Sequence, residues 1–253
     1  MKIEEINYAS WSDFKAKFTS DLYMDDHFER GTYLFRGQGV EDWSLSSTFD
    51  RWFKGDREDK VKVADHLLEQ FKKECELEPI PEQARQDKIL MLSLAQHNGL
   101  PTRLLDWSES PYVAAFFAFS GHIRHGISLE KNIAIWTLNT ADDIWDVEHG
   151  CEIVTVPSFG NERIHNQHGR FTYLRAPYAS VEEYVKNFPG EKVGLRKLLI
   201  PVRDALAAMA ELDSMGINHS RIYPGISGNA KAAEVRVLIN LRRAKRTAKT
   251  SNG

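Results

Sequence analysis

The segment LAQHNGLPTRLLDWSESPYVAAFFAF, Leu94 to Phe119, places many hydrogen-bonding side chains among leucine, alanine and phenylalanine. Asn98-Gly99 is expected to end a helix, because glycine tolerates the left-handed conformation of a C-cap. Ser110-Pro111 is expected to start a second helix, with serine as N-cap and proline in the first turn. That helix is apolar on nearly every side, so it should be buried. Residues 96–110 then form a connection held between two rigid helices, where proteins often position functional groups.

The rest of the chain predicts a mixture of helices and strands. Ser10 with Asp13 and Ser180 with Glu183 are typical helix starts. Further helices are predicted over 56–78, 82–97, 202–216 and 229–244, the last with Ala233, Val237 and Leu241 on one face. Strands are predicted at residues 32–36, 132–138, 152–156, 170–174 and 196–200.

This pattern indicates an α+β protein, a single mixed domain with a central, mostly antiparallel sheet flanked by helices. Residues 1–24 are expected to be an N-terminal helical segment, 25–241 the main domain and 242–253 a basic C-terminal tail. The tail has two interpretations: a solvated chain end, or a segment that contacts nucleic acid.

The composition is that of an ordinary globular protein. The 253 residues are 42% hydrophobic and 27% charged, and the formal net charge of −3 argues against a dedicated nucleic-acid binder. Cys75 and Cys151 lie far apart without a CxxC partner, which suits a reducing compartment. No apolar run reaches the length of a membrane span, and the N-terminus lacks the apolar run of a signal peptide. A cytoplasmic protein without a membrane partner is therefore expected.

Several polar residues of the opening segment are candidates for chemistry. Arg103 and Asp106 are close enough in sequence to pair, either as part of a site or as an ion pair that holds the turn. His97 at a helix C-terminus is either a cap or a functional group. Trp107 is a core or stacking residue. Ser108 lacks the G-x-S-x-G context of a hydrolase nucleophile, so a hydrolase triad is not expected.

Two other stretches carry candidate residues. In YLFRGQ, Tyr33 to Gln38, Arg36 is expected at the end of a strand. With Gly37 beside it, this arginine is either an anion clamp or a structural ion-pair partner. In NERIHNQHGRFTYL, Asn161 to Leu174, Arg163 and Gln167 lie four residues apart, and the two histidines match no metal-site spacing. No metal is therefore expected.

Together these stretches resemble the FRG domain family, which is named for the F/Y-R-G triplet that stands here as Phe35-Arg36-Gly37. The family's A-Q-H-H-G-L-P-T-R-L-L-D-W-T segment stands here as Ala95 to Ser108, with Asn98 and Ser108 as departures. Its R-x-x-x-Q-x-G-x-F and Y/F-P-x-x-x-G elements are matched by Arg163 to Phe171 and by Tyr223 to Gly228. The resemblance spans roughly residues 25 to 235. Since the family occurs in bacterial, phage and mobile-element proteins, it implies a role in phage defence or as a toxin.

The order of the motifs is also similar to that of ADP-ribosyltransferases. In both, an early basic residue, here Arg36, precedes a hydroxyl, here Ser108. Gln167 stands where such enzymes usually have a late glutamate, and Asp106 or Glu162 could supply the carboxylate instead. Glu234 lies in a predicted helix, which argues against that role for it. NAD or another nucleotide is the expected ligand, and the acceptor is an unknown protein or nucleic acid. Arg36 would anchor the phosphates, His97 or Ser108 would hold a ribose hydroxyl, and Tyr112 or Trp107 would stack on nicotinamide.

The full set of candidate residues combines these roles. The catalytic candidates are Arg36, His97, Ser108 and Gln167, and the binding candidates are Arg36, Gly37, Gln96, Arg103, Asp106, Trp107, Tyr112 and Arg163. The competing hypothesis is a non-catalytic module that recognises a nucleotide or nucleic acid. Both hypotheses require Arg36 and the segment from Gln96 to Ser110 to line the same hollow.

Overall fold

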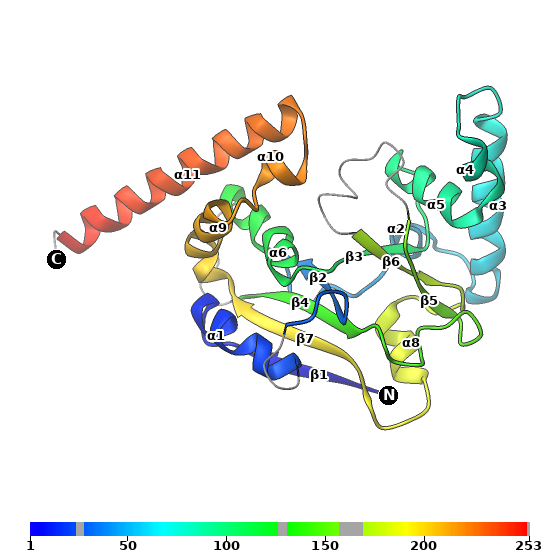
Figure 1. Ribbon diagram of the computed structural model, residues 1–253, viewed down its shortest axis with the longest axis horizontal. Helices are drawn as coiled ribbons and strands as arrows, with labels where there is room; N and C mark the ends of the chain where they lie inside the picture. The colour runs from blue at the N-terminus through cyan, green and yellow to red at the C-terminus, as the bar shows by residue number, and fades with distance from the viewer. Residues whose placement is uncertain (24–27, 126–130, 157–168, 252–253) are drawn as a thin grey trace.

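A seven-stranded open sheet forms the centre of the computed structural model, which describes residues 1–23, 28–125, 131–156 and 169–251 (Figure 1). The strand order is β1-β7-β4-β2-β3-β6-β5, and only β1 and β7 are parallel neighbours. The strands are β1 (Lys2–Asn7), β2 (Tyr33–Gln38), β3 (Leu104–Ser108), β4 (Asn132–Asn139), β5 (Cys151–Val154), β6 (Gly169–Leu174) and β7 (Val193–Pro201). The predicted α+β domain with a mostly antiparallel sheet is confirmed.

Helices flank the sheet on both faces. They are α1 (Trp11–Leu22), α2 (Thr48–Trp52), α3 (Lys60–Glu74), α4 (Glu82–Gln86), α5 (Lys88–His97), α6 (Pro111–His125), α8 (Val181–Asn187), α9 (Ala205–Ser214), α10 (His219–Ile222) and α11 (Ile226–Ser251), with 3₁₀ turns at Arg57–Asp59 and Val202–Asp204. The predicted caps are confirmed at Ser10, whose side chain accepts from the Asp13 amide, and at Ser110, whose hydroxyl accepts from the Val113 amide.

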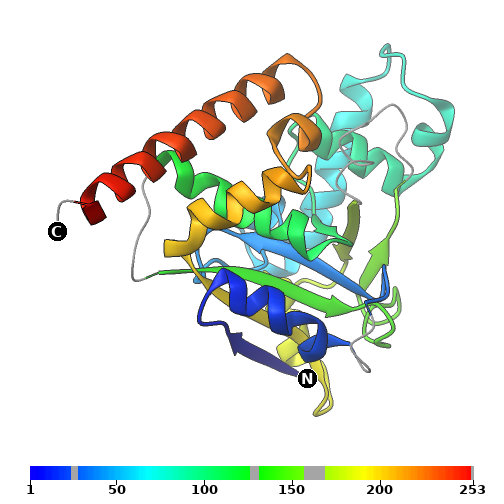
Figure 2. The same ribbon diagram turned by 60° about the vertical axis from the view of Figure 1, so that its left-hand side comes forward.

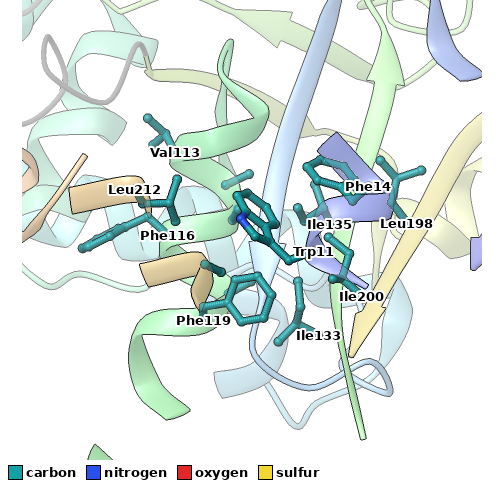
Figure 3. Packing of buried hydrophobic residues seen from close by; sticks show 14 of the residues in the cluster. Trp11, Phe14, Val113, Phe116, Phe119, Ile133, Ile135, Leu198, Ile200 and Leu212 are labelled. Carbon is teal, nitrogen blue, oxygen red and sulfur yellow. The ribbon is translucent and has the colours of Figure 1, made fainter. Parts of the chain in front are cut away.

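Three apolar clusters hold the layers together. In the largest, α1, α6 and α9 pack on one face of the sheet, and Trp11 lies between Phe119 of α6 and the strand residues around Ile135 (Figure 3). On the opposite face, α8 packs over β1 and β7, and its Tyr184 belongs to the second cluster. The third cluster joins α3 and α5 to β3 and β6, with Leu104 at its centre. Burial of these side chains is the main force that fixes the strand order.

Residues 2–7 and 82–97 differ from the predictions. Lys2–Asn7 is a strand and not part of a helical segment; it forms the sheet edge beside β7, a partner almost two hundred residues away that local sequence cannot reveal. The helix predicted over 82–97 is divided at Asp87, whose carboxylate caps α5 by accepting from the amides of Ile89 and Leu90. An aspartate inside a helical pattern competes in this way for backbone donors.

The connection 96–110 is not a simple turn between two helices. Residues 104–108 form β3, which pairs with β6 along its whole length and with β2 at one position only. The strand within this connection was not predicted, because a five-residue strand has no periodicity to distinguish it. The polar residues of this segment therefore lie at the centre of the sheet.

The last helix also differs from expectation. α11 runs along the outside of α9 and α10 and extends away from the body of the protein (Figures 1 and 2). Its buried residues are Ala232, Val235 and Ile239, whereas Val237 and Leu241 are exposed. The helix carries apolar residues at helical spacing on two adjacent faces, and the sequence pattern alone does not say which face meets the core. The boundary predicted at residue 242 falls within this helix.

Candidate functional site

The two central strands separate from each other next to the candidate residues. β2 pairs with β4 at six positions but with β3 only through Phe35 and Ser108. Beyond that pair, the Arg36 guanidinium bridges the strands by donating from Nη1 to the Asp106 carbonyl oxygen at 2.7 Å. A cavity of about 1000 Å³ opens here, lined by residues of β2, the following loop, α2, α5, β3, α6 and β6 and by Tyr223. We call it the central cavity.

The central cavity brings together residues from both motifs that the sequence analysis singled out. Its lining includes Arg36, Gly37, Gln96, His97, Asp106, Trp107 and Ser108. Arg36 and the segment from Gln96 to Ser108 therefore share one hollow, which both functional hypotheses required. A volume of this size is sufficient for a nucleotide, because ligand sites in proteins commonly measure about 300–1000 Å³.

Part of the Arg36 side chain is exposed where it lines the cavity. Its side chain is 22% exposed, and its Nε is buried without a hydrogen-bond partner. Asp106 is the acidic partner, with Oδ2 at 3.7 Å from Nη1, which is too long for a strong hydrogen bond. Burial lowers the pKa of Arg36, Asp106 opposes this effect, and the like charge of Arg51 lowers the pKa further. Because arginine stays protonated in proteins, an anion beside Arg36 would compensate this buried charge.

A hydrogen-bonded chain orients Asp106. Gln96 at the end of α5 donates from Nε2 to Asp106 Oδ1 at 2.8 Å, and its own carbonyl accepts from the buried hydroxyl of Thr102. The Asp106 side chain is nevertheless 57% exposed, so it can still accept from a ligand. The glutamine, threonine and aspartate of the longest motif thus form one unit that presents a carboxylate to the central cavity.

The other candidate residues at the cavity differ in exposure. His97 is exposed at the C-terminus of α5, where Gly99 adopts a positive φ of 91° as expected for the turn that follows. Ser108 is buried, and its hydroxyl accepts from the Ser110 amide. Trp107 is buried as well, and its Nε1 donates to Thr172 Oγ1 at 2.9 Å. Only His97 of these three projects from an exposed position.

Gly37 lines the cavity, but its lack of a side chain serves the packing of a helix. A Cβ at this position would lie 1.8 Å from the carbonyl oxygen of Ala114, so the glycine lets α6 approach β2. Gly228 in the first turn of α11 is similar, because a Cβ there would lie 1.7 Å from the Tyr223 carbonyl oxygen. Both glycines are needed by the scaffold that positions Arg36 and Tyr223.

Arg103 lies apart from the cavity lining and does not pair with Asp106, contrary to expectation. Its side chain is 2% exposed and points to the other side of the motif, where it lies 3.4 Å from Asp50 and donates to the Tyr178 carbonyl oxygen at 2.8 Å. Lys60 approaches the same Asp50 oxygen at 3.4 Å. Burial lowers the pKa of Arg103, and Asp50 opposes this effect. This placement favours a structural role for Arg103.

Other predicted binding residues are placed elsewhere. Tyr112 is half-buried against Trp11 and Phe18 in the α1–α6 packing and is not part of the cavity lining. Gln167, Arg163 and Glu162 lie outside the described residues. Glu234 lies in α11, as the sequence pattern indicated.

Sequence reasoning missed several lining residues, among them Gln38, Trp43, Arg51 and Phe117. Trp43 and Arg51 lie in a stretch without helical or strand periodicity, so nothing local marked them. One available signal was composition, because tryptophan and arginine outside a recognisable core pattern are frequent at binding surfaces. Tyr223 also lines the cavity, and the sequence marks it only as part of the Y/F-P-x-x-x-G element.

Neither a metal centre nor a membrane span is found in the part of the chain that the structure describes. No group of three or more His, Cys, Asp or Glu side chains is placed there to hold a metal ion. No helix within those same ranges has the length and apolar character needed to cross a membrane.

Comparison with known proteins identifies one family. The model of the FRG domain matches residues 31–126, a range that contains every residue of the cavity lining except Phe171 and Tyr223. No curated protein and no solved structure matches the chain. The F-R-G triplet and the A-Q-H-x-G-L-P-T-R-L-L-D-W segment thus converge on one cavity within the matched range, and residues 31–126 of the chain match the FRG domain.

Proposed function

We propose that the central cavity binds NAD or another nucleotide and that the chain is an ADP-ribosyltransferase-like enzyme. The observation that carries this proposal is the convergence of Arg36, Gln96, His97, Asp106 and Ser108 on one cavity with aromatic walls. A partly exposed guanidinium suits a diphosphate, and the exposed carboxylate of Asp106 suits a ribose hydroxyl.

The chemistry requires few groups. The bond between ribose C1′ and nicotinamide breaks, and its electron pair leaves with nicotinamide, so positive charge develops on the ribose. The acceptor, which is water or a group on another molecule, bonds to C1′ and loses one proton to Asp106, which passes it to solvent. Arg36 holds the diphosphate, and the chain through Gln96 keeps Asp106 in place during this step. Glu109 is not used, because Arg30 and Arg170 already flank it.

The test is incubation of the purified protein with NAD labelled in the nicotinamide ring, and in parallel with NAD labelled in the adenylate portion plus cell extract. We expect nicotinamide release or label transfer that falls at least tenfold in Arg36→Ala and in Asp106→Asn. A folded wild-type protein that neither binds nor consumes NAD would remove the proposal. A role in phage defence or as a toxin rests on the family resemblance, and it predicts that induced expression slows bacterial growth only while Arg36 is intact.

A non-catalytic nucleotide-binding module is the second candidate. It is supported by the small number of carboxylates that could take part in catalysis. Among the described lining residues the carboxylates are Asp42 and Asp106, and Asp106 already interacts with Arg36 and Gln96. This candidate predicts NAD or nucleotide binding without nicotinamide release. A nucleic acid bound by residues 242–253 is tested by filter binding, where deletion of these residues should lower both affinity and its salt dependence.

A further inference from the structure

The loop that follows β2 holds an exposed tryptophan at the central cavity. Trp43 is 58% exposed and belongs to the cavity lining. Within the described part of the chain, no aromatic ring and no cation is placed against its ring. A large apolar side chain left in water at a cavity is typical of a ligand contact, because burial elsewhere would have been more favourable.

The backbone around Trp43 is fixed on both sides. Ahead of it, the Glu41 carboxylate accepts from the backbone amide and the side-chain amide of Asn132 at 3.2 and 3.1 Å. Behind it, the buried Gln38 donates to the Ser44 carbonyl oxygen at 3.0 Å, and the Leu45 amide donates to Glu182 at 2.6 Å. The exposed ring is therefore presented by an anchored loop, and this pre-organisation favours ligand stacking.

A second guanidinium lies at the same cavity. Arg51 of α2 lines it and is close enough to Arg36 to lower the pKa of that residue by like-charge repulsion. The Arg51 side chain is held by the Ser46 carbonyl oxygen, which belongs to the loop that carries Trp43. Two guanidinium groups that repel each other across a cavity would both be stabilised by an anion with more than one charged oxygen.

We propose that Trp43 stacks on the base of the ligand while Arg36 and Arg51 bind its phosphates, so that the substrate class is a nucleoside diphosphate or a dinucleotide containing one. This inference rests on the proposed function, since it assigns the parts of a nucleotide to the same cavity. It adds a base-stacking residue and a second phosphate contact.

The test is isothermal titration of the full chain with ADP, NAD and inorganic pyrophosphate. Trp43→Ala should lower the affinity for ADP and NAD by about 5- to 150-fold, the usual range for loss of one base stack. The affinity for pyrophosphate should change by less than twofold. Trp43→Phe should recover most of the loss, because a phenyl ring still stacks. Arg51→Gln should lower the affinity for all three ligands.

Trp52→Ala is the matched control. Trp52 is 52% exposed and lies nearby in the chain, but it packs against Phe49 with ring centroids 5.7 Å apart and does not line the cavity. The Trp52→Ala variant should bind all three ligands with the affinity of the wild type. Circular dichroism and thermal melting confirm that each variant is folded.

The outcomes separate this inference from the proposed function. If the wild type binds ADP or NAD and Trp43→Ala binds them equally well, the stacking role is overturned while nucleotide binding stands. If Trp43→Ala weakens ADP selectively but the wild type releases no nicotinamide from NAD, the stacking role is supported and the enzymatic proposal falls. If the wild type binds none of the three ligands, both are overturned.

Discussion

Substitution of Asp50 tests whether Arg103 has a structural role, unlike Arg36, which lines the central cavity. Asp50 is 1% exposed and is the carboxylate that both Lys60 and Arg103 approach, each at 3.4 Å. It also accepts from the Ser47 hydroxyl at 2.6 Å. Asp50→Asn preserves the shape of the side chain and removes its charge, so two buried cations lose their counter-ion.

The expected cost follows from that geometry. Removal of one partner of a buried ion pair costs about 3–5 kcal/mol, because the remaining charge stays desolvated without compensation. For a chain of this size, such a loss should lower the melting temperature by about 6–20 °C. Asp106→Asn is the control, because its carboxylate is 57% exposed and a pair of that kind contributes about 0–1 kcal/mol.

The assay is urea denaturation followed by circular dichroism, with calorimetry as a second measure. The double variant Asp50→Asn with Arg103→Met should be less destabilised than Asp50→Asn alone, because one uncompensated buried charge has been removed. An Asp50→Asn protein within 1 kcal/mol of the wild type, or less destabilised than Asp106→Asn, would refute the reasoning. In that case Arg103 would again be a candidate for ligand binding.

Three further predictions concern the scaffold. Gly37→Ala should unfold the protein or lower its melting temperature by more than 10 °C in a thermal melt, because the new Cβ would lie 1.8 Å from the Ala114 carbonyl oxygen and several kcal/mol of strain would result. Leu105→Ala should cost about 2–5 kcal/mol in urea denaturation, since this side chain is buried in the cluster beneath β3; a cost below 1 kcal/mol would contradict its core position. Glu211→Gln should lower stability at pH 7 by about 0.5–1 kcal/mol, because the hydrogen bond from Lys15 holds the pKa of Glu211 below its usual 4.5. That contribution is present above the unfolded-state pKa near 4.5 and is lost as the pH falls through the lower folded-state pKa, so the melting curves of wild type and variant should converge as the pH is lowered past that point.

Local signals in the sequence predicted the ends of helices well. Ser10, Ser110 and Gly99 act through contacts within four residues, so their roles are visible in the order of the amino acids. The same holds for the apolar pattern of α6. The family motifs also pointed to the correct residues for the cavity, in particular Arg36 and Asp106.

The rest depended on partners that are distant in the sequence. Arg103 was expected to meet Asp106, three residues away, but its counter-ion is Asp50, which is 53 positions earlier. β3 is a strand because β6 supplies its hydrogen bonds, and nothing within 104–108 discloses that pairing. Similarly, α11 presents two apolar faces, and only the position of α9 and α10 decides which one is buried.

The three residues of the F-R-G triplet make different contacts, because successive side chains of a strand point to opposite faces of the sheet. Phe35 is buried under α6 and forms the only backbone pair with β3, at Ser108. Arg36 points the other way, and the guanidinium takes over the bridge to β3 at the Asp106 carbonyl oxygen, where regular pairing has stopped. Gly37 then allows the backbone of α6 to approach at the position where the strands diverge. A lysine at position 36 would keep the charge but has no planar fork with which to hold that carbonyl and an anion together. Arg36 therefore bridges β2 and β3 where their backbone pairing stops, and the same residue lines the central cavity.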